Sequence, residues 1–211
     1  MNKPAVRILI FLVLIVNSVT AQVGVKVSQL APYGDIGEYF NKAPAYEVFA
    51  VLKEDNFRER FGILYSHLTP RIDTMPVYAV QVDPGTGRQT VIPGFLNNRM
   101  LTFAVVTADF GYRIINIKHK FFLYGAAGIV AGKSHTEYTE VLQTVSETTA
   151  NSDVIIAGFK LCGDIEYKLS GHVELFAEYT YNGLVDRPWT THYTNTLASI
   201  GIYVSLKPFD D

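Results

Sequence analysis

The chain has 211 residues, of which 48% are hydrophobic, and its 18 basic and 20 acidic residues give a formal net charge of −2 at pH 7. That balance offers no general attraction for nucleic acid. The lone cysteine, Cys162, excludes an intramolecular disulfide, so a single domain of this length needs another means of closure.

The first residues have the features of a cleavable signal peptide. Lys3 and Arg7 form a positive n-region, and an apolar run follows over residues 8–16, ahead of a small-residue cleavage site. The run is shorter than the roughly 20 apolar residues that a transmembrane helix needs. We therefore assign residues 1–21 to a signal peptide and residues 22–211 to one exported domain.

Eight segments of the mature chain have the alternation of a strand with one apolar and one polar face. In residues 172–181, for example, Leu175 and Tyr179 alternate with Glu174 and Glu178. One segment is ambiguous, because both of its faces are apolar or small. The predicted strands cover residues 22–31, 44–53, 57–68, 99–114, 119–132 (the ambiguous segment), 153–169, 171–182 and 194–207.

Short and long connections alternate between these strands. The tight turns fall at residues 54–56, 115–118 and 170–171, whereas the other four connections are longer. With the N-terminus in the periplasm, every tight turn is periplasmic and every long loop is outside, as in outer-membrane barrels. The sequence therefore predicts an all-β fold, an eight-stranded antiparallel up-and-down transmembrane barrel in the bacterial outer membrane, with both termini in the periplasm.

The polar faces of these strands predict a charged interior. An eight-stranded barrel is only wide enough to be filled by its own side chains, so opposite charges should pair there. On a lipid face near the midplane, Arg or Lys would cost roughly 2–4 kcal/mol each. The predicted lumen network, which favours a plugged barrel over a porin, contains Lys26, Glu47, Arg58, Arg60, Asp109, Arg113, Lys160, Asp164, Glu166, Glu174 and Glu178, together with Lys53 and Lys168.

The last strand resembles the terminal assembly signal that the barrel-insertion machinery recognises in outer-membrane barrels. Its pattern of a polar residue, a glycine and spaced apolar residues is carried by Ser199, Gly201, Val204 and Leu206. Pairing along an exposed strand edge is the physical mode that such recognition would use.

Across nearly the whole mature chain, the order of features also resembles the PorT-like family among the small outer-membrane barrels of the OmpA and OmpX type from diderm bacteria. Gly24 to Ser28 resembles its opening strand, Gly62 to Ser66 its third strand, and Phe121 to Gly128 its fifth strand. The resemblance implies a general outer-membrane barrel, with some relatives serving secretion machinery, and it brings no catalytic residues.

The sequence predicts no catalytic, cofactor or metal site. Ser66 precedes His67 and Ser134 precedes His135, but adjacent residues of a strand point to opposite faces, so neither pair can act together on one wall. A partner on another strand stays open, because catalytic triads are recognised by geometry. No two histidines are spaced as metal ligands on one strand, and Cys162 is isolated.

The longest connection, residues 69–98, contains a predicted hairpin. Residues 77–82 and 88–92 flank a turn at Asp83 to Gly87. Loops carry binding on rigid barrel scaffolds, and a protruding strand pair can accept a partner edge. The neighbouring segment 136–151 is polar and expected to be mobile. The candidate binding residues are Tyr78, Val80, Val82 and Val91 in the hairpin, with Arg187 and Trp189 in the last outer loop.

These observations favour a non-enzymatic integral outer-membrane barrel whose outer loops bind a partner or a surface, or which serves a secretion or envelope complex. The expected partners are outer-membrane lipid and lipopolysaccharide, the barrel-insertion machinery and such a complex, with no cofactor and no nucleic acid. Two alternatives stay open. One is an outer-membrane acyl-chain hydrolase or transferase, and the other is a soluble secreted lipocalin-like ligand binder.

Overall fold

The computed structural model describes residues 21–72, 74–142, 145–187 and 191–205. Nine antiparallel strands and one short helix make up this part of the chain, and no helix in it is long and apolar enough to cross a membrane. The elements are β1 (Ala21–Pro32), η1 (Gly34–Ile36), β2 (Ala43–Glu54), β3 (Phe57–Leu68), β4 (Thr74–Val82), β5 (Gln89–Ile117), β6 (Phe121–Leu142), β7 (Val145–Lys168), β8 (Val173–Asp186) and β9 (Asn195–Ser205).

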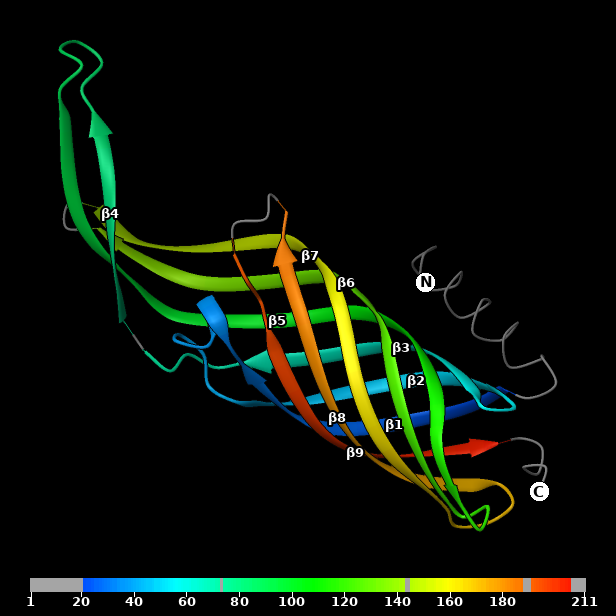
Figure 1. Cartoon of the computed structure of the whole chain (residues 1–211). Helices are drawn as coiled ribbons and strands as arrows, with labels where there is room; N and C mark the ends of the chain where they lie inside the picture. Colours follow the sequence, from blue (N-terminus) through cyan, green and yellow to red (C-terminus); the bar gives the residue numbers. More distant parts are fainter. Residues whose placement is uncertain (1–20, 73, 143–144, 188–190, 206–211) are drawn as a thin grey trace, which may run out of the picture.

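Eight of the strands close into a barrel. The sheet order is β3-β2-β1-β9-β8-β7-β6-β5-β4, and β3 also pairs with β5, which joins the two sides of the sheet (Figure 1). Of the described strands, β4 alone stands outside the ring, paired with the first residues of β5. The predicted eight-stranded antiparallel barrel is therefore confirmed, and closure leaves its wall without a free edge.

The two ends of the barrel differ. At one end, here called the turn end, tight connections join β2 to β3, β5 to β6, and β7 to β8. Asp55, Lys118 and His119 adopt positive φ angles in the first two of these connections. The second turn lies later than the predicted residues 115–118, because Ile115 and Ile117 continue the strand beyond a bulge at Arg113. The opposite end, the loop end, carries the longer connections.

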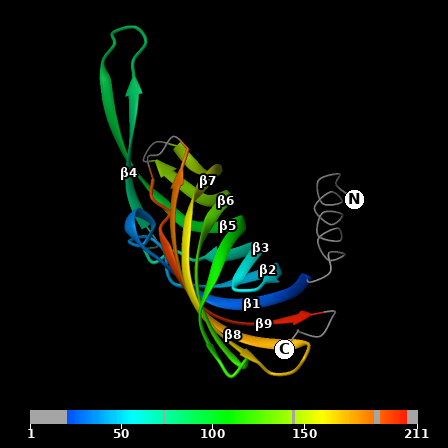
Figure 2. The same cartoon turned by 45° about the vertical axis from the view of Figure 1, so that its right-hand side comes forward.

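The long strands β5, β6 and β7 continue well beyond the barrel at the loop end (Figure 2). The predicted strands 88–92 and 99–114 are parts of one strand, β5, joined through a bulge between Asn97 and Met100. The segment 136–151, expected to be mobile, instead extends β6 and β7 over its described residues. β-Branched residues such as Thr136 and Val141 favour strands. Each extension also pairs with the hydrogen-bonding groups of the neighbouring strand's backbone.

Apolar side chains cover the outside of the barrel at every strand. The ambiguous strand β6 is resolved by its neighbours: Phe122 and Tyr124 are buried inside, whereas Ile129 is 66% exposed on the outside. The outward-facing belt, represented by one exposed residue from each barrel strand, includes Val25, Val48, Ile63, Val106, Ile129, Leu161, Leu175 and Ile200.

The interior has an apolar layer toward the loop end. After β1, the chain folds back through η1, and Ile36 and Phe40 pack with Leu30 and Leu101 in one buried cluster. The Arg99 guanidinium lies over the Phe40 ring at 5.5 Å. This apolar layer was not predicted, and it closes the loop end of the barrel above the charged layer.

Candidate functional site

The charged layer of the interior joins opposite walls of the barrel. Strand alternation places acidic residues of β7 and β8 on one wall and basic residues of β1, β2 and β3 on the other. The residues involved are separated by more than 100 positions in the sequence in most pairs, as between Arg58 and Asp164. Ten of the predicted residues are buried in this layer: Lys26, Glu47, Arg58, Arg60, Asp109, Lys160, Asp164, Glu166, Glu174 and Glu178.

Nearer the turn end, Arg58 is the centre of one ion-pair group. Its Nη1 and Nη2 donate to the two carboxylate oxygens of Asp164 at 2.6 and 2.7 Å, and Nη1 also donates to Glu166 at 2.6 Å. The Lys53 ammonium donates to Glu166 at 2.7 Å and to Glu174 at 2.6 Å. A bidentate guanidinium with shared carboxylates is a strong, directional arrangement.

A second group lies further toward the loop end, around Glu178. Its carboxylate accepts from the Lys26 ammonium at 2.5 Å and from the Arg60 guanidinium. Arg60 also donates to Asp109 at 3.1 Å, and the Lys160 ammonium donates to the same oxygen at 2.6 Å. Because every charge in the two groups has an opposite partner, the interior is a cross-wall brace rather than a lining of unpaired charges.

Aromatic side chains separate and cover these charges. Phe49, Phe176 and Tyr203 form a buried cluster, and the Arg60 guanidinium lies 5.4 Å from the centre of the Phe49 ring. The Lys53 ammonium lies 4.6 Å from the centre of the Tyr203 ring. The sequence did not predict this cluster, although Phe176 between two glutamates on a polar face was a signal for it.

Two of the predicted lumen residues, Arg113 and Lys168, lie near the turn end and are half-buried. The Arg113 guanidinium donates to the Asn56 side-chain oxygen at 2.7 and 3.0 Å and makes no ion pair among the described residues. Arg113 nevertheless faces the interior, since it pairs with the buried Tyr124 and its guanidinium lies 5.5 Å from the centre of the Phe122 ring. Its contacts are this ring and the Asn56 amide oxygen rather than a carboxylate.

One buried group has the composition of a metal site. Ligand atoms of Cys162, Asp164 and Glu178 lie within 4.8 Å of one another. However, the two carboxylates already bind Arg58 and Arg60, and the Cys162 sulfur lies 3.7 Å from Arg60 Nη2. The guanidinium groups thus occupy the place that a cation would take, and the group belongs to the ion-pair brace.

The serine and histidine pairs point to opposite sides of the wall, as predicted. Ser66 is buried and donates to the Pro44 carbonyl at 2.9 Å, whereas the exposed His67 contacts Thr102. His135 contacts Asp153 at 2.5 Å on the outside. That hydrogen bond raises the pKa of His135 and lowers the pKa of Asp153.

The outer hairpin of β4 and the start of β5 is nearly uncharged. Asp83 and Arg88 at its turn are the only charged residues between positions 74 and 97, and the Asp83 N–H donates to the Arg88 carbonyl at 2.9 Å. Val82, Val91 and Phe95 are exposed, and Val80 is 57% exposed. An exposed apolar surface of this kind on a protruding element marks an interaction site.

The register of the hairpin fixes which residues of β4 direct their backbone N–H and C=O groups toward the free edge of the strand. Since Asp83 and Arg88 form a hydrogen-bonded pair, the alternation of an antiparallel ladder directs the backbone N–H and C=O groups of Val80 and Val82 away from β5. Pro76, which has no N–H, falls in the same phase. Among the described residues β4 pairs with β5 alone, so these groups form an open strand edge.

The remaining predicted binding residues are only partly placed. Arg187 is exposed after β8, and its backbone N–H donates to the Ile155 carbonyl at 3.1 Å. The side chain of Tyr78 and the whole of Trp189 lie outside the described residues.

The terminal strand β9 pairs with β1 and β8 in the ring. Ser199 is buried and hydrogen bonds to Ser28 at 2.7 Å, and Val204 is exposed on the outside. At Gly201 a side-chain Cβ would lie 2.3 Å from the Phe176 ring, so the packing of the interior requires this glycine. Leu206, the last residue of the predicted assembly signal, lies outside the described residues.

The fold and interior define a class: a closed eight-stranded antiparallel barrel with an apolar outside and a braced, charged inside. No family model and no curated protein sequence matches the chain, so the PorT-like resemblance gains no support from them. The solved structure of Neisserial surface protein A is similar at a TM-score of 0.51 and 14% identity, covering 88% of this chain and 97% of that one. A major outer membrane protein from Thermus thermophilus gives a TM-score of 0.48 at 12% identity, with 88% and 99% coverage. At these identities the likeness to Neisserial surface protein A shows that the two chains share the small-barrel fold.

Proposed function

We propose that the protein is a non-enzymatic integral barrel of the bacterial outer membrane, whose braced interior holds an outer hairpin in place for binding a partner. The observation that carries the proposal is the inverted distribution of side chains. Lys26, Arg58 and Arg60 are buried inside, whereas an apolar belt surrounds the outside. In water such a belt would be far larger than the apolar patches of soluble monomers, and in a bilayer it is the required surface.

Fractionation and gel mobility test the membrane part of the proposal. The protein is expected in the outer-membrane fraction, and its unboiled form is expected to migrate differently from its boiled form, because a closed barrel resists detergent until heated. A soluble periplasmic protein with a single mobility would support the lipocalin-like alternative and overturn the proposal.

We propose further that the partner adds an extended strand to the free edge of β4. Main-chain hydrogen bonds supply affinity in such strand addition, and the neighbouring side chains supply specificity. In this proposal the partner is a protein of an envelope or secretion complex, because a strand edge presents the backbone groups that another polypeptide can pair with.

Proline substitutions at two opposed valines test whether the partner pairs with the free edge of β4 or binds another part of the hairpin. Val80 and Val91 face each other across the hairpin, and neither N–H bonds to the opposite strand, so Val80→Pro and Val91→Pro remove equivalent groups from opposite edges. Val80→Pro is expected to reduce co-purification of the partner from solubilised outer membranes by about tenfold, since it removes a donor and blocks the edge.

Val91→Pro is the matched control and is expected to retain the partner, whereas a chain without residues 75–93 is expected to lose it. Equal loss in both proline variants would indicate binding through the apolar face. Unchanged co-purification without residues 75–93 would rule out the hairpin as the binding element.

A further inference from the structure

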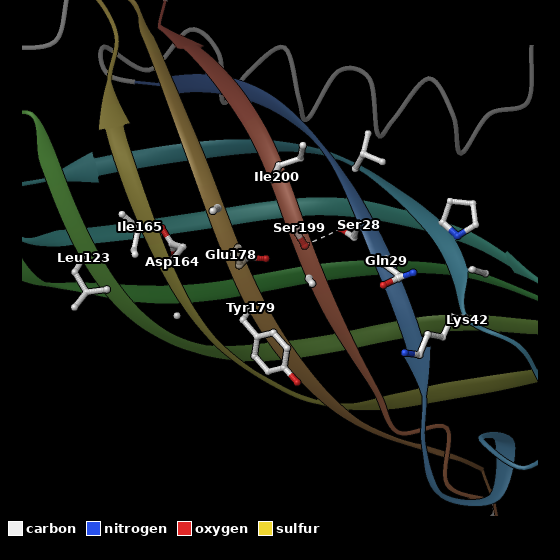
Figure 3. A pocket seen from close by; sticks show the side chains of 16 residues that line it. Ser28, Gln29, Lys42, Leu123, Asp164, Ile165, Glu178, Tyr179, Ser199 and Ile200 are labelled. Carbon is white, nitrogen blue, oxygen red and sulfur yellow. Dashed lines mark hydrogen bonds between the residues drawn. The ribbon is translucent and has the colours of Figure 1, made fainter.

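A shallow groove crosses the outside of the barrel wall. It has a volume of about 880 Å³ and crosses six strands that are neighbours in the barrel wall, in the order β2, β1, β9, β8, β7 and β6. Lys42, just before β2, lies at one end of the groove, and Leu123 of β6 lies at the other (Figure 3). A strongly twisted sheet is saddle-shaped, so the outer surface of this closed barrel can be hollow along one diagonal.

Small residues form the floor of the groove, and larger apolar ones rise beside it. Gly163 and Ala177 are exposed along the floor, and Ile165, Tyr179 and Ile200 flank it. The residues exposed in the groove are apolar, with polar groups confined to the loop-end side. The shape therefore suits a flexible hydrocarbon chain that lies against the wall.

The glycine in the floor is not explained by the packing of the protein. A Cβ at Gly163 would have its nearest neighbour, the Tyr124 carbonyl oxygen, at 3.8 Å, which is ordinary contact. At Gly158 of the same strand, a Cβ would lie 1.9 Å from the Gly183 carbonyl oxygen. The barrel thus requires glycine at position 158, whereas at position 163 the missing side chain only leaves space outside the wall.

The charge at the loop end identifies what the other part of the ligand would be. Lys42 is exposed, and it has no acidic partner among the described residues. The neighbouring outward positions, Gln29 and Pro44, pair with each other at the end of β1 and the start of β2. Lys42 therefore lies beyond the last row of the apolar belt, at the depth where a lipid carries its headgroup if the belt spans the bilayer.

We infer that the groove is a binding site for an anionic membrane phospholipid, with an acyl chain along the floor at Gly163 and Ala177 and the phosphate of the net-negative headgroup at Lys42. The inference rests on the proposed membrane location and adds a specific lipid site to it. Two features select the ligand: the groove is continuous with the lipid-facing belt, and the unpaired ammonium complements an anionic headgroup.

The test counts lipids retained by the folded protein in native mass spectrometry. The probes are dipalmitoyl phosphatidylglycerol, which carries a net negative charge, and dipalmitoyl phosphatidylcholine, which carries none. The parent protein is expected to retain one phosphatidylglycerol in preference to phosphatidylcholine. Gly163→Leu is expected to weaken retention of both lipids by about tenfold, because leucine fills the floor. Lys42→Gln is expected to remove the preference while leaving chain binding in place.

Ala104→Leu is the matched control, since Ala104 is exposed on the outside of β5 and does not line the groove. Ala177→Leu serves as a second floor variant if Gly163→Leu fails to fold. Equal retention by the floor variant and the control would overturn the groove site, as would an unchanged preference in Lys42→Gln. A parent chain that does not insert into lipid vesicles at all would overturn the membrane proposal instead, which keeps the two failures distinct.

Discussion

Replacing Arg58 with Met is expected to lower the free energy of unfolding by about 3–5 kcal/mol, because it leaves buried charges uncompensated. Arg58 donates to both oxygens of Asp164 and to Glu166 across the lumen. Without the guanidinium, the carboxylates of Asp164 and Glu166 remain close together in a closed interior. Lys53 still forms an ion pair with Glu166, but Asp164 loses its ion-pair partner. Urea unfolding of the barrel in lipid vesicles, followed by gel mobility, measures the change.

Two further variants test the cause of that loss. Arg113→Met removes a half-buried guanidinium outside the ion-pair groups and is expected to change stability by no more than about 0.5 kcal/mol. Arg58→Met combined with Asp164→Leu is expected to recover a large part of the loss, because replacing a buried pair by apolar residues is often neutral. A single Arg58→Met variant as stable as Arg113→Met would show that the brace contributes little.

Placing arginine at Val106 is expected to destabilise the folded protein by about 2–4 kcal/mol if the apolar belt lies in lipid. Val106 is 54% exposed in the middle of the outward face of β5. In water an arginine at such a position would be well tolerated, whereas at mid-bilayer depth its charge must leave water. The vesicle unfolding assay described above provides the measurement.

Val80→Arg is the control, because Val80 is also an exposed valine in a strand but lies on the outer hairpin beyond the barrel. It is expected to change stability by less than about 0.5 kcal/mol. A soluble barrel would treat the two substitutions alike. Equal and small effects would therefore contradict the membrane-spanning assignment of the belt.

The sequence could predict those features that depend on neighbouring residues of one strand, and could not predict those that depend on how strands pair. In a strand, the side chain's face repeats every two residues, so the alternation in residues 172–181 was enough to place Glu174 and Glu178 inside. In β6 the signal failed, because both faces carry apolar or small residues. There the register with β5 and β7 decides, since it places Tyr124 beside Asp164.

Long-range partners were beyond prediction for a related reason. The sequence predicted a balanced set of interior charges, but alternation contains no information about which strands face each other. Closure through the β3–β5 pairing places Arg58 opposite Asp164, and it also creates the twisted outer surface in which Gly163 forms a groove floor. Closure likewise decides that Arg113 contacts the Phe122 ring and the Asn56 amide oxygen, which alternation alone could not specify.

The sequence by itself determined the number of strands in the barrel, the alternation of tight turns with long loops, and which face of most strands is charged, because these are local properties of the chain. The tertiary structure decided the ion-pair partners and the apolar closure by Ile36 and Phe40. It also decided the continuous extension of β5 into the hairpin and the groove ending at Lys42. Each of these depends on how distant segments meet when the ring closes, and no local pattern of residues specifies that meeting.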